Sequence, residues 1–151
     1  MKQNKGYSLV ELIIVVVFVS VLAMIAVPRI NFSITTEKGA HALSKKITTD
    51  LRRTRQLAIS DAASNTDGYQ LQMNGTSPYT DYDIINLNTS TTINSHTINS
   101  DINCTNGETF NFGPMGNLLT GSDSQIDITG SDSSFTITIT SATGMIKCVE
   151  N

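Results

Sequence analysis

The carboxylate of Glu11 is the first group in this chain that could do chemistry, because it stands near the start of a long apolar run. From Leu12 to Val27 the chain carries no charge, and Ser20 is the one polar side chain. A carboxylate deep in lipid costs on the order of 2.5–3.5 kcal/mol, so such a group needs a partner. A charge-assisted bond to an amine in low-dielectric surroundings would supply one.

The residues in front of the run could create that amine through proteolysis. Met1–Gly6 is a short hydrophilic leader that ends in a small residue immediately before the apolar run. A secretory signal peptide carries its small-residue cleavage site after an apolar core of about 7–15 residues. The run here is longer, and Ala23–Ala26 lacks the A-x-A spacing. A cut between Gly6 and Tyr7, which keeps the apolar segment, fits the pattern better.

These residues resemble a known signature. Lys5-Gly6 followed by Tyr7-Ser8-Leu9-Val10-Glu11-Leu12 is similar to the class III leader of type IV pilins and type II secretion pseudopilins. The resemblance implies that a prepilin peptidase cuts after Gly6 and that the new amine of Tyr7 is methylated. It also implies that this amine meets Glu11 of a neighbouring subunit during assembly. Tyr7 replaces the usual Phe, and Pro28 stands where the family often has a helix-kinking proline.

The same resemblance implies partners and a location. The partners are other pilin or pseudopilin subunits, the prepilin peptidase, an inner-membrane assembly platform and the lipid bilayer. The chain would be a single-pass protein of the bacterial inner membrane with its outer domain in the periplasm, and part of a filament after assembly. At about 1.5 Å per residue, a helix over Leu9–Ile30 would cross roughly 30 Å of hydrocarbon. A plain membrane anchor, with Glu11 at the interface, is the alternative.

Two cysteines, Cys104 and Cys148, are available for a covalent link. In an oxidising compartment we expect them to form a disulfide, which would be worth roughly 4 kcal/mol on the chain-entropy model. Two metal-ligating thiols are the alternative, but His41 and His96 are isolated in the sequence and offer no zinc spacing.

Recognisable catalytic patterns were not found in the sequence, so we expect neither an enzyme nor a cofactor. His96 is expected on an exposed polar loop between Thr91 and Asn103, without a nucleophile beside it. Asp123, Asp127 and Asp132 could bind calcium, but they lack the EF-hand pattern, and acids on loops are usually solvated.

Charge is divided unevenly along this chain, whose net charge is −3. Basic residues dominate between Arg29 and Arg55, whereas Lys147 is the one basic residue after Gln56. The basic stretch could rest against lipid headgroups, pair with the acidic domain of a neighbouring subunit, or be a solvated helix face. Nucleic acid is not an expected partner, although a DNA-capturing role through Arg52, Arg53 and Arg55 is kept as an alternative.

Hydrophobic periodicity predicts helix first and strands afterwards. An apolar stripe through Leu43, Ile47, Leu51 and Ala58 predicts an amphipathic helix over residues 40–62. We expect one long helix from Tyr7 to about Asp61, bent near Pro28. After Asp61 the period changes to two, which predicts strands over Tyr69–Met73, Asp83–Leu87, Thr91–Ile98, Glu108–Phe112, Gln125–Thr129, Ser134–Thr140 and Met145–Val149.

The second half of the chain carries a more diffuse resemblance. A helix containing Arg55, the segment Phe110-Asn-Phe-Gly-Pro-Met-Gly116 and a terminal hairpin turn with Thr143-Gly144 are together similar to the GspH/FimT group of minor pilins and pseudopilins. Members linked to DNA binding tend to be basic after the last hairpin glycine. Here Met145, Ile146 and Lys147 follow it.

The sequence therefore predicts an α+β pilin fold, in which a long N-terminal helix packs on a C-terminal antiparallel sheet domain. Its parts would be a cleaved leader (1–6), a transmembrane or filament-core helix (7–33), an amphipathic stem helix (34–62) and a globular β domain (63–151). The expected function is a structural subunit of a type IV pilus or a type II secretion pseudopilus, a minor subunit at initiation or at the tip. The major pilin of the filament is the alternative within this class.

Overall fold

The computed structural model describes residues 9–26, 33–131 and 133–151, and it divides the chain into two compact units. The first unit is Met1–Phe32 and the second is Ser33–Asn151. Each unit is described by itself below. The predicted cleavage site at Gly6 and Tyr7 and the predicted kink at Pro28 lie outside the described residues.

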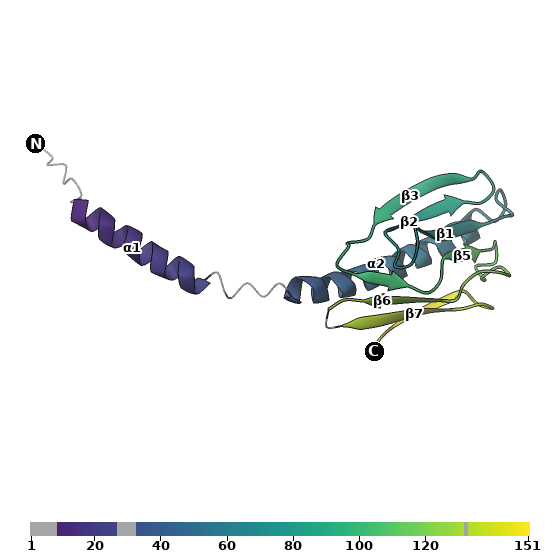
Figure 1. Cartoon of the computed structure of the whole chain (residues 1–151). Helices are drawn as coiled ribbons and strands as arrows, with labels where there is room; N and C mark the ends of the chain where they lie inside the picture. The colour runs from purple at the N-terminus through teal and green to yellow at the C-terminus, as the bar shows by residue number, and fades with distance from the viewer. Residues whose placement is uncertain (1–8, 27–32, 132) are drawn as a thin grey trace, which may run out of the picture. The chain divides into compact units, whose positions relative to one another are not determined.

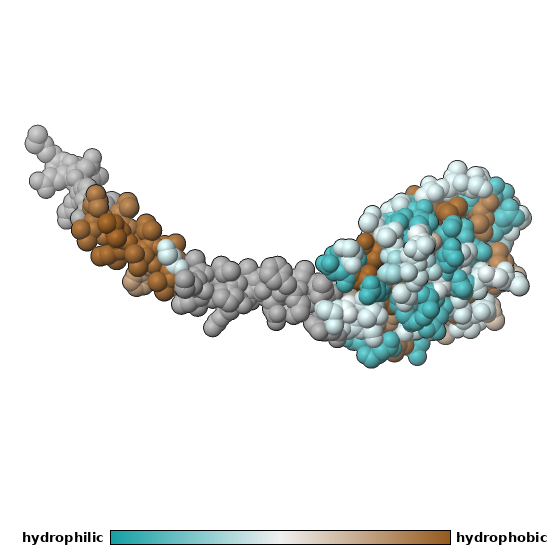
Figure 2. All heavy atoms as spheres, viewed as in Figure 1, coloured by the Kyte–Doolittle hydropathy of each residue, from teal (hydrophilic) through white to brown (hydrophobic). Residues whose placement is uncertain are grey.

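The first unit contains helix α1, Leu9–Ala26. Its large apolar side chains from Leu9 to Leu22 are exposed on every side, from 75% of the surface of Leu9 to 52% of that of Ile13. Figure 2 shows the surface of this helix as mostly hydrophobic. The helix forms because a run of Leu, Ile, Val and Phe contains neither Gly nor Pro, and it has no polar face to turn toward water.

The second unit begins with helix α2, Ser33–Ser60, which is amphipathic. The predicted stripe is confirmed, because Leu43, Ile47, Leu51 and Ala58 are all buried. Thr54 lies in the same stripe with no exposed surface, and its hydroxyl donates to the carbonyl oxygen of Asp50 at 2.8 Å. This internal bond satisfies the hydroxyl, so a polar side chain can lie in the core at low cost.

In the described part of the chain after α2, eight strands form two antiparallel four-stranded sheets, in the orders β3-β2-β1-β5 and β4-β6-β7-β8. Their bounds are β1 Tyr69–Asn74, β2 Asp81–Asn86, β3 Thr91–Thr97, β4 Asn103–Thr105, β5 Thr109–Phe112, β6 Gln125–Thr129, β7 Ser134–Thr140 and β8 Met145–Glu150. The predicted bounds of β6 and β7 are confirmed, because those strands alternate cleanly between apolar and polar residues.

Helix α2 contacts strands of both sheets, chiefly β1 in the first and β6, β7 and β8 in the second (Figure 1). The core lies among these three layers. Phe110 and Phe112 of β5, Ile126 of β6 and Ile137 of β7 have no exposed surface, and neither has Tyr82 of β2. α2 therefore closes the core that the two sheets share.

This architecture corrects the predicted fold. The chain does not form one long helix packed on one sheet: α1 and α2 belong to separate units, and the strands form two sheets. The physical reason lies in the two helical patterns. A helix that is apolar on all sides has no single face to pack on a sheet, whereas the one-sided stripe of α2 has one.

The predicted membrane span is also corrected. Within the part of the chain that the structure describes, no helix combines the length and the apolarity needed to cross a membrane. The predicted single-pass location in the inner membrane is overturned by this finding. In the structure, α2 shares one compact unit with the strands.

Candidate functional site

Glu11 lies in the first turn of α1 and is exposed, with the exposed side chains of Val10 and Leu12 beside it. An acidic group in the first turn of a helix is favoured by the partial positive charge of the free amide groups there. Between Leu9 and Leu22, Glu11 is the one charged residue. The first unit therefore offers an apolar surface with one carboxylate, and a cation carried by another apolar helix could pair with it.

The residues that carry the second resemblance meet at one junction. The Nε of Arg55 on α2 donates a hydrogen bond of 3.0 Å to the carbonyl oxygen of Gly116. Gly144, in the turn between β7 and β8, packs against the same carbonyl group: a Cβ at Gly144 would lie 1.8 Å from the Gly116 oxygen. This junction ties the helix, the turn after β5 and the terminal hairpin together.

The junction bears on the DNA-capturing alternative. Arg52 and Arg53 are exposed on α2, but Arg55 is half-buried and its guanidinium is engaged by Gly116. The three arginines therefore do not form one free basic patch for phosphate groups. Arg55 acts in the structure as a tie between α2 and the strands.

A buried polar network lies between α2 and the first sheet. The hydroxyl of Tyr82 donates to Oδ2 of Asp50 at 2.6 Å, and both residues are buried. Nε2 of His96 lies 3.5 Å from the same oxygen, and Nδ1 of His96 lies 2.9 Å from Nζ of Lys46. The rings of Tyr82 and His96 pack at 5.2 Å between centroids. Burial first, and then the hydrogen bond to Asp50, raises the pKa of Tyr82 far above its usual value.

Both ring nitrogens of His96 face donor groups in this network. The Lys46 ammonium, which can only donate, lies at Nδ1, and the side-chain nitrogen of Asn94 lies 3.0 Å from Nε2. His96 therefore links Lys46 and Asn94 to the carboxylate of Asp50. The network contains neither a Ser nor a Cys nucleophile among the described residues in contact with His96, and it serves to hold α2 on β2 and β3.

This placement corrects the expectation for His96, which belongs to strand β3 and not to an exposed loop. Sequence reasoning also missed Asp50 and Tyr82. A signal was present for Asp50: it lies three residues after Ile47 and four before Thr54, so it shares the buried side of α2. A lone acid on an apolar helix face indicates a buried partner, but nothing local identifies Tyr82 as that partner.

Both cysteines are free, so the predicted disulfide between Cys104 and Cys148 is not formed in this structure. Cys104 lies on β4 and Cys148 on β8, the two outer strands of the second sheet, with β6 and β7 between them. Three strand spacings amount to about 14 Å, whereas a disulfide needs Cα atoms within about 7 Å. Sequence separation alone could not show that these strands lie at opposite edges.

The acids considered for calcium are placed differently from one another. The carboxylate of Asp127 on β6 accepts hydrogen bonds from the side chains of Asn106, Gln125 and Thr136. That of Asp123 accepts from two backbone amides, those of residues 108 and 109. Asp132 lies outside the described residues. Among the residues described, no group of three potential ligands is close enough together to hold a metal ion.

The comparisons with known proteins do not add a family. No protein-family model matches the chain, and no curated protein and no solved structure is significantly similar to it.

Proposed function

We propose that this chain is a structural subunit of a filament of the type IV pilus or type II secretion pseudopilus kind, and that it assembles through α1. The observation that carries the proposal is the apolar surface of α1, which is exposed on all sides and interrupted by the charge of Glu11. Burying one such Leu, Ile, Val or Phe side chain contributes about 1.5–3 kcal/mol.

A helix without a polar face is stabilised when apolar partners pack against it on every side. A single neighbouring protein buries one stripe of a helix, whereas a bundle of like helices surrounds each member. The leader-like residues Lys5, Gly6 and Tyr7 before α1 support the same proposal, because they are similar to the signature of subunits that form such bundles.

Glu11 has a defined role in this proposal. Inside a bundle of apolar helices its carboxylate would be desolvated, and an unpaired charge there is strongly unfavourable. Cleavage after Gly6 would create an amine at Tyr7 that could pair with Glu11 of the next subunit. The pairing would fix the axial position of one helix against another, because only one stagger brings the two charges together.

We further propose a minor subunit, at initiation or at the tip, on the resemblance to the GspH/FimT group. The junction of Arg55, Gly116 and Gly144 supports this choice, because three residues that carry the resemblance lie in contact there. The abundance of the chain in sheared filaments tests it. A minor subunit is scarce there, whereas a major pilin dominates the preparation.

Two measurements test the proposal. Mass spectrometry of the mature protein should find a chain that begins at Tyr7 with a methylated amine; a chain that begins at Met1 or is cut after Ala26 would contradict it. Glu11→Ala should fold its strands normally and enter filaments poorly. Ser20→Ala is the matched control, because Ser20 lies on α1 and its hydroxyl donates to the carbonyl oxygen of Val16 in the same helix, at 2.7 Å. Equal incorporation of the two variants would remove the role of Glu11.

A further inference from the structure

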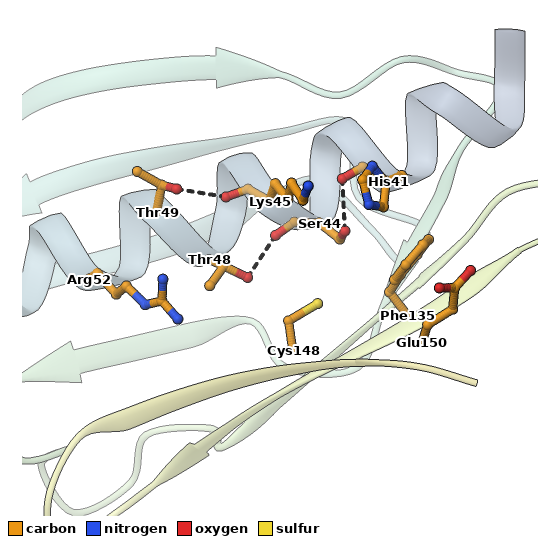
Figure 3. Close-up of a pocket in the computed structure, with 9 residues that line it drawn as sticks. All are labelled: His41, Ser44, Lys45, Thr48, Thr49, Arg52, Phe135, Cys148 and Glu150. Carbon is orange, nitrogen blue, oxygen red and sulfur yellow. Dashed lines mark hydrogen bonds between the residues drawn. The ribbon is translucent and has the colours of Figure 1, made fainter.

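A groove of about 500 Å³ lies between α2 and the last two strands (Figure 3). α2 lines one side with His41, Lys45 and Arg52, and strands β7 and β8 line the other with Phe135, Cys148 and Glu150. We call this feature the α2–β8 groove. Its size falls within the range of pockets that hold ligands, about 300–1,000 Å³.

Two cationic side chains of α2 line the groove. Lys45 and Arg52 are exposed, and neither side chain makes a hydrogen bond or an ion pair with any residue that the structure describes. They are seven residues apart, which places both on the same side of the helix. Phe135 of β7 is buried, so the groove combines a cationic side with an apolar base, and the carboxylate of Glu150 lies at the end next to Phe135.

The groove is bounded by the open edge of a sheet. β8 is the outer strand of the second sheet and pairs with β7 alone. The amide of Asn151 donates to the carbonyl oxygen of Ser134 at 2.9 Å, and along an antiparallel ladder such bonded pairs alternate with unbonded ones. The residues of β8 whose backbone amides and carbonyls point away from β7 are therefore Ile146, Cys148 and Glu150.

The edge of β8 has only part of the protection that edge strands usually have. Strand edges are commonly blunted by charges, proline or a bulge. β8 carries the charges of Lys147 and Glu150 but has no proline and a regular register, and its outward face exposes 61% of Met145 and 42% of Val149 on either side of Lys147. The strand thus offers unpaired backbone groups beside the cationic flank of α2.

We propose that the α2–β8 groove binds an extended acidic peptide segment of a partner protein, which adds to the edge of β8 as a further strand. The open amides and carbonyls of β8 supply backbone hydrogen bonds, as in other cases of strand addition. Lys45 and Arg52 select carboxylate side chains on the face of the segment that turns toward α2. The site does not involve α1, so this proposal and its test are independent of filament assembly.

The fold also sets the order of residues along the segment. Arg55 lies beside Gly144 at the start of β8. His41 packs on Phe135, with ring centroids 5.7 Å apart, and Phe135 pairs with Glu150 at the end of β8. α2 and β8 therefore run in opposite directions. Acidic residues of the segment belong near the start of β8, beside Arg52. Apolar residues belong near Glu150, because the charge of Glu150 would repel an acidic side chain there.

The experiment uses the full chain in a non-ionic detergent and a labelled, end-blocked peptide of sequence TVTVTETE, followed by fluorescence anisotropy. Its alternating residues place two valines and then two glutamates on one face of an antiparallel strand. The same peptide with lysine in place of glutamate should bind at least about tenfold more weakly. The double variant Lys45→Gln with Arg52→Gln should also bind TVTVTETE about tenfold more weakly. Arg53 is exposed on α2 but lies outside the groove, so Arg53→Gln should bind the peptide normally.

Hydrogen exchange distinguishes strand addition from simple charge attraction. On binding, the amides of Ile146, Cys148 and Glu150 should become protected, while those of Lys147 and Val149 are protected beforehand by β7. Peptide binding without this alternating protection would overturn the proposal. So would equal binding of the lysine peptide, or failure of TVTVTETE to bind. If the same amides became protected at high protein concentration without peptide, the edge of β8 would bind a second copy of the chain instead, and the proposal would be overturned.

Discussion

The Nε of Arg55 and the carbonyl oxygen of Gly116 are joined by a 3.0 Å hydrogen bond that links α2 to the turn after β5. The backbone of Gly144 approaches the same oxygen so closely that a side chain there has no room. Residues that are 61 positions apart in the chain, Arg55 and Gly116, thus meet with a third segment at one point. The contact couples the helix to the hairpin β7–β8, and the side chain of Ile59 on α2 also packs against Gly116.

Gly144→Ala should destabilise the second unit by roughly 2–4 kcal/mol, because the new Cβ would lie 1.8 Å from the Gly116 oxygen at a backbone φ of +63°. Gly121→Ala is the matched control: its φ is +86°, but nothing lies within 4 Å of its Cβ position. The control should cost only the conformational penalty, about 1 kcal/mol. Urea unfolding of both variants measures the difference, and equal losses would show that the contact at Gly144 is unimportant.

Removing the carboxylate of Asp50 should cost about 2–3 kcal/mol, because the buried hydroxyl of Tyr82 then loses its acceptor. Asp67→Ala provides the comparison, since Asp67 is an exposed acid, and should change stability by no more than about 0.5 kcal/mol. Thermal unfolding of Asp50→Ala and Asp67→Ala tests this. A similar small change in both would mean that the network adds nothing to stability.

Stability should fall in alkaline solution. Burial first and Asp50 second raise the pKa of Tyr82 above its ordinary 10.0, and burial raises the pKa of the Cys104 thiol from 9.0 to about 12. Groups whose pKa is raised by folding stabilise the protein fully below their unfolded pKa and lose that contribution as the pH rises through the folded pKa. The free energy of unfolding should therefore decline from about pH 9 upward, by up to about 1.4 kcal/mol per pH unit for each group.

Tyr82→Phe separates the two contributions. The variant lacks the titrating hydroxyl, so its stability should fall less steeply above pH 10 than that of the parent chain, although it is less stable at pH 7. Urea unfolding at pH 7, 9, 10 and 11 gives the slopes. Parallel slopes for the two proteins would show that Tyr82 does not remain protonated in the folded state.

The two cysteines should differ sharply in reactivity. Cys104 has no exposed surface and a raised thiol pKa, whereas Cys148 is partly exposed beside the α2–β8 groove. Iodoacetamide at pH 8 should modify Cys148 and leave Cys104 intact until urea is added, because only the accessible thiolate reacts. Mass spectrometry of digests identifies the labelled residue. A mass two hydrogens lower with neither residue labelled would reveal a disulfide and contradict the strand order.

Local features of the fold could be predicted from the sequence, and pairings could not. The stripe from Leu43 to Ala58 and the alternation from Ser134 to Thr140 each determine which side of one element is buried, and both predictions are confirmed. Strand β4 was missed because it spans only Asn103–Thr105. Which strands are neighbours depends on contacts between distant segments, so one sheet was expected where two exist.

The candidate sites show the same division. Glu11 could be singled out because a charge in an apolar run needs no knowledge of the fold. The network of Asp50, Tyr82 and His96 could not, since those residues come from three separate elements that meet only after α2 packs on the first sheet. The disulfide prediction failed for the same reason: composition shows that Cys104 and Cys148 exist but not that β6 and β7 separate them.

The order of strands has a consequence for how the second unit folds. β1, β2 and β3 enter the first sheet, β4 enters the second, β5 returns to the first, and β6 to β8 complete the second. No single cut therefore divides the chain into one half for each sheet, because residues 106–108 lead from β4 of the second sheet back to β5 of the first. The two sheets should form and melt in a single cooperative transition, and isolated halves such as residues 33–105 should remain unfolded.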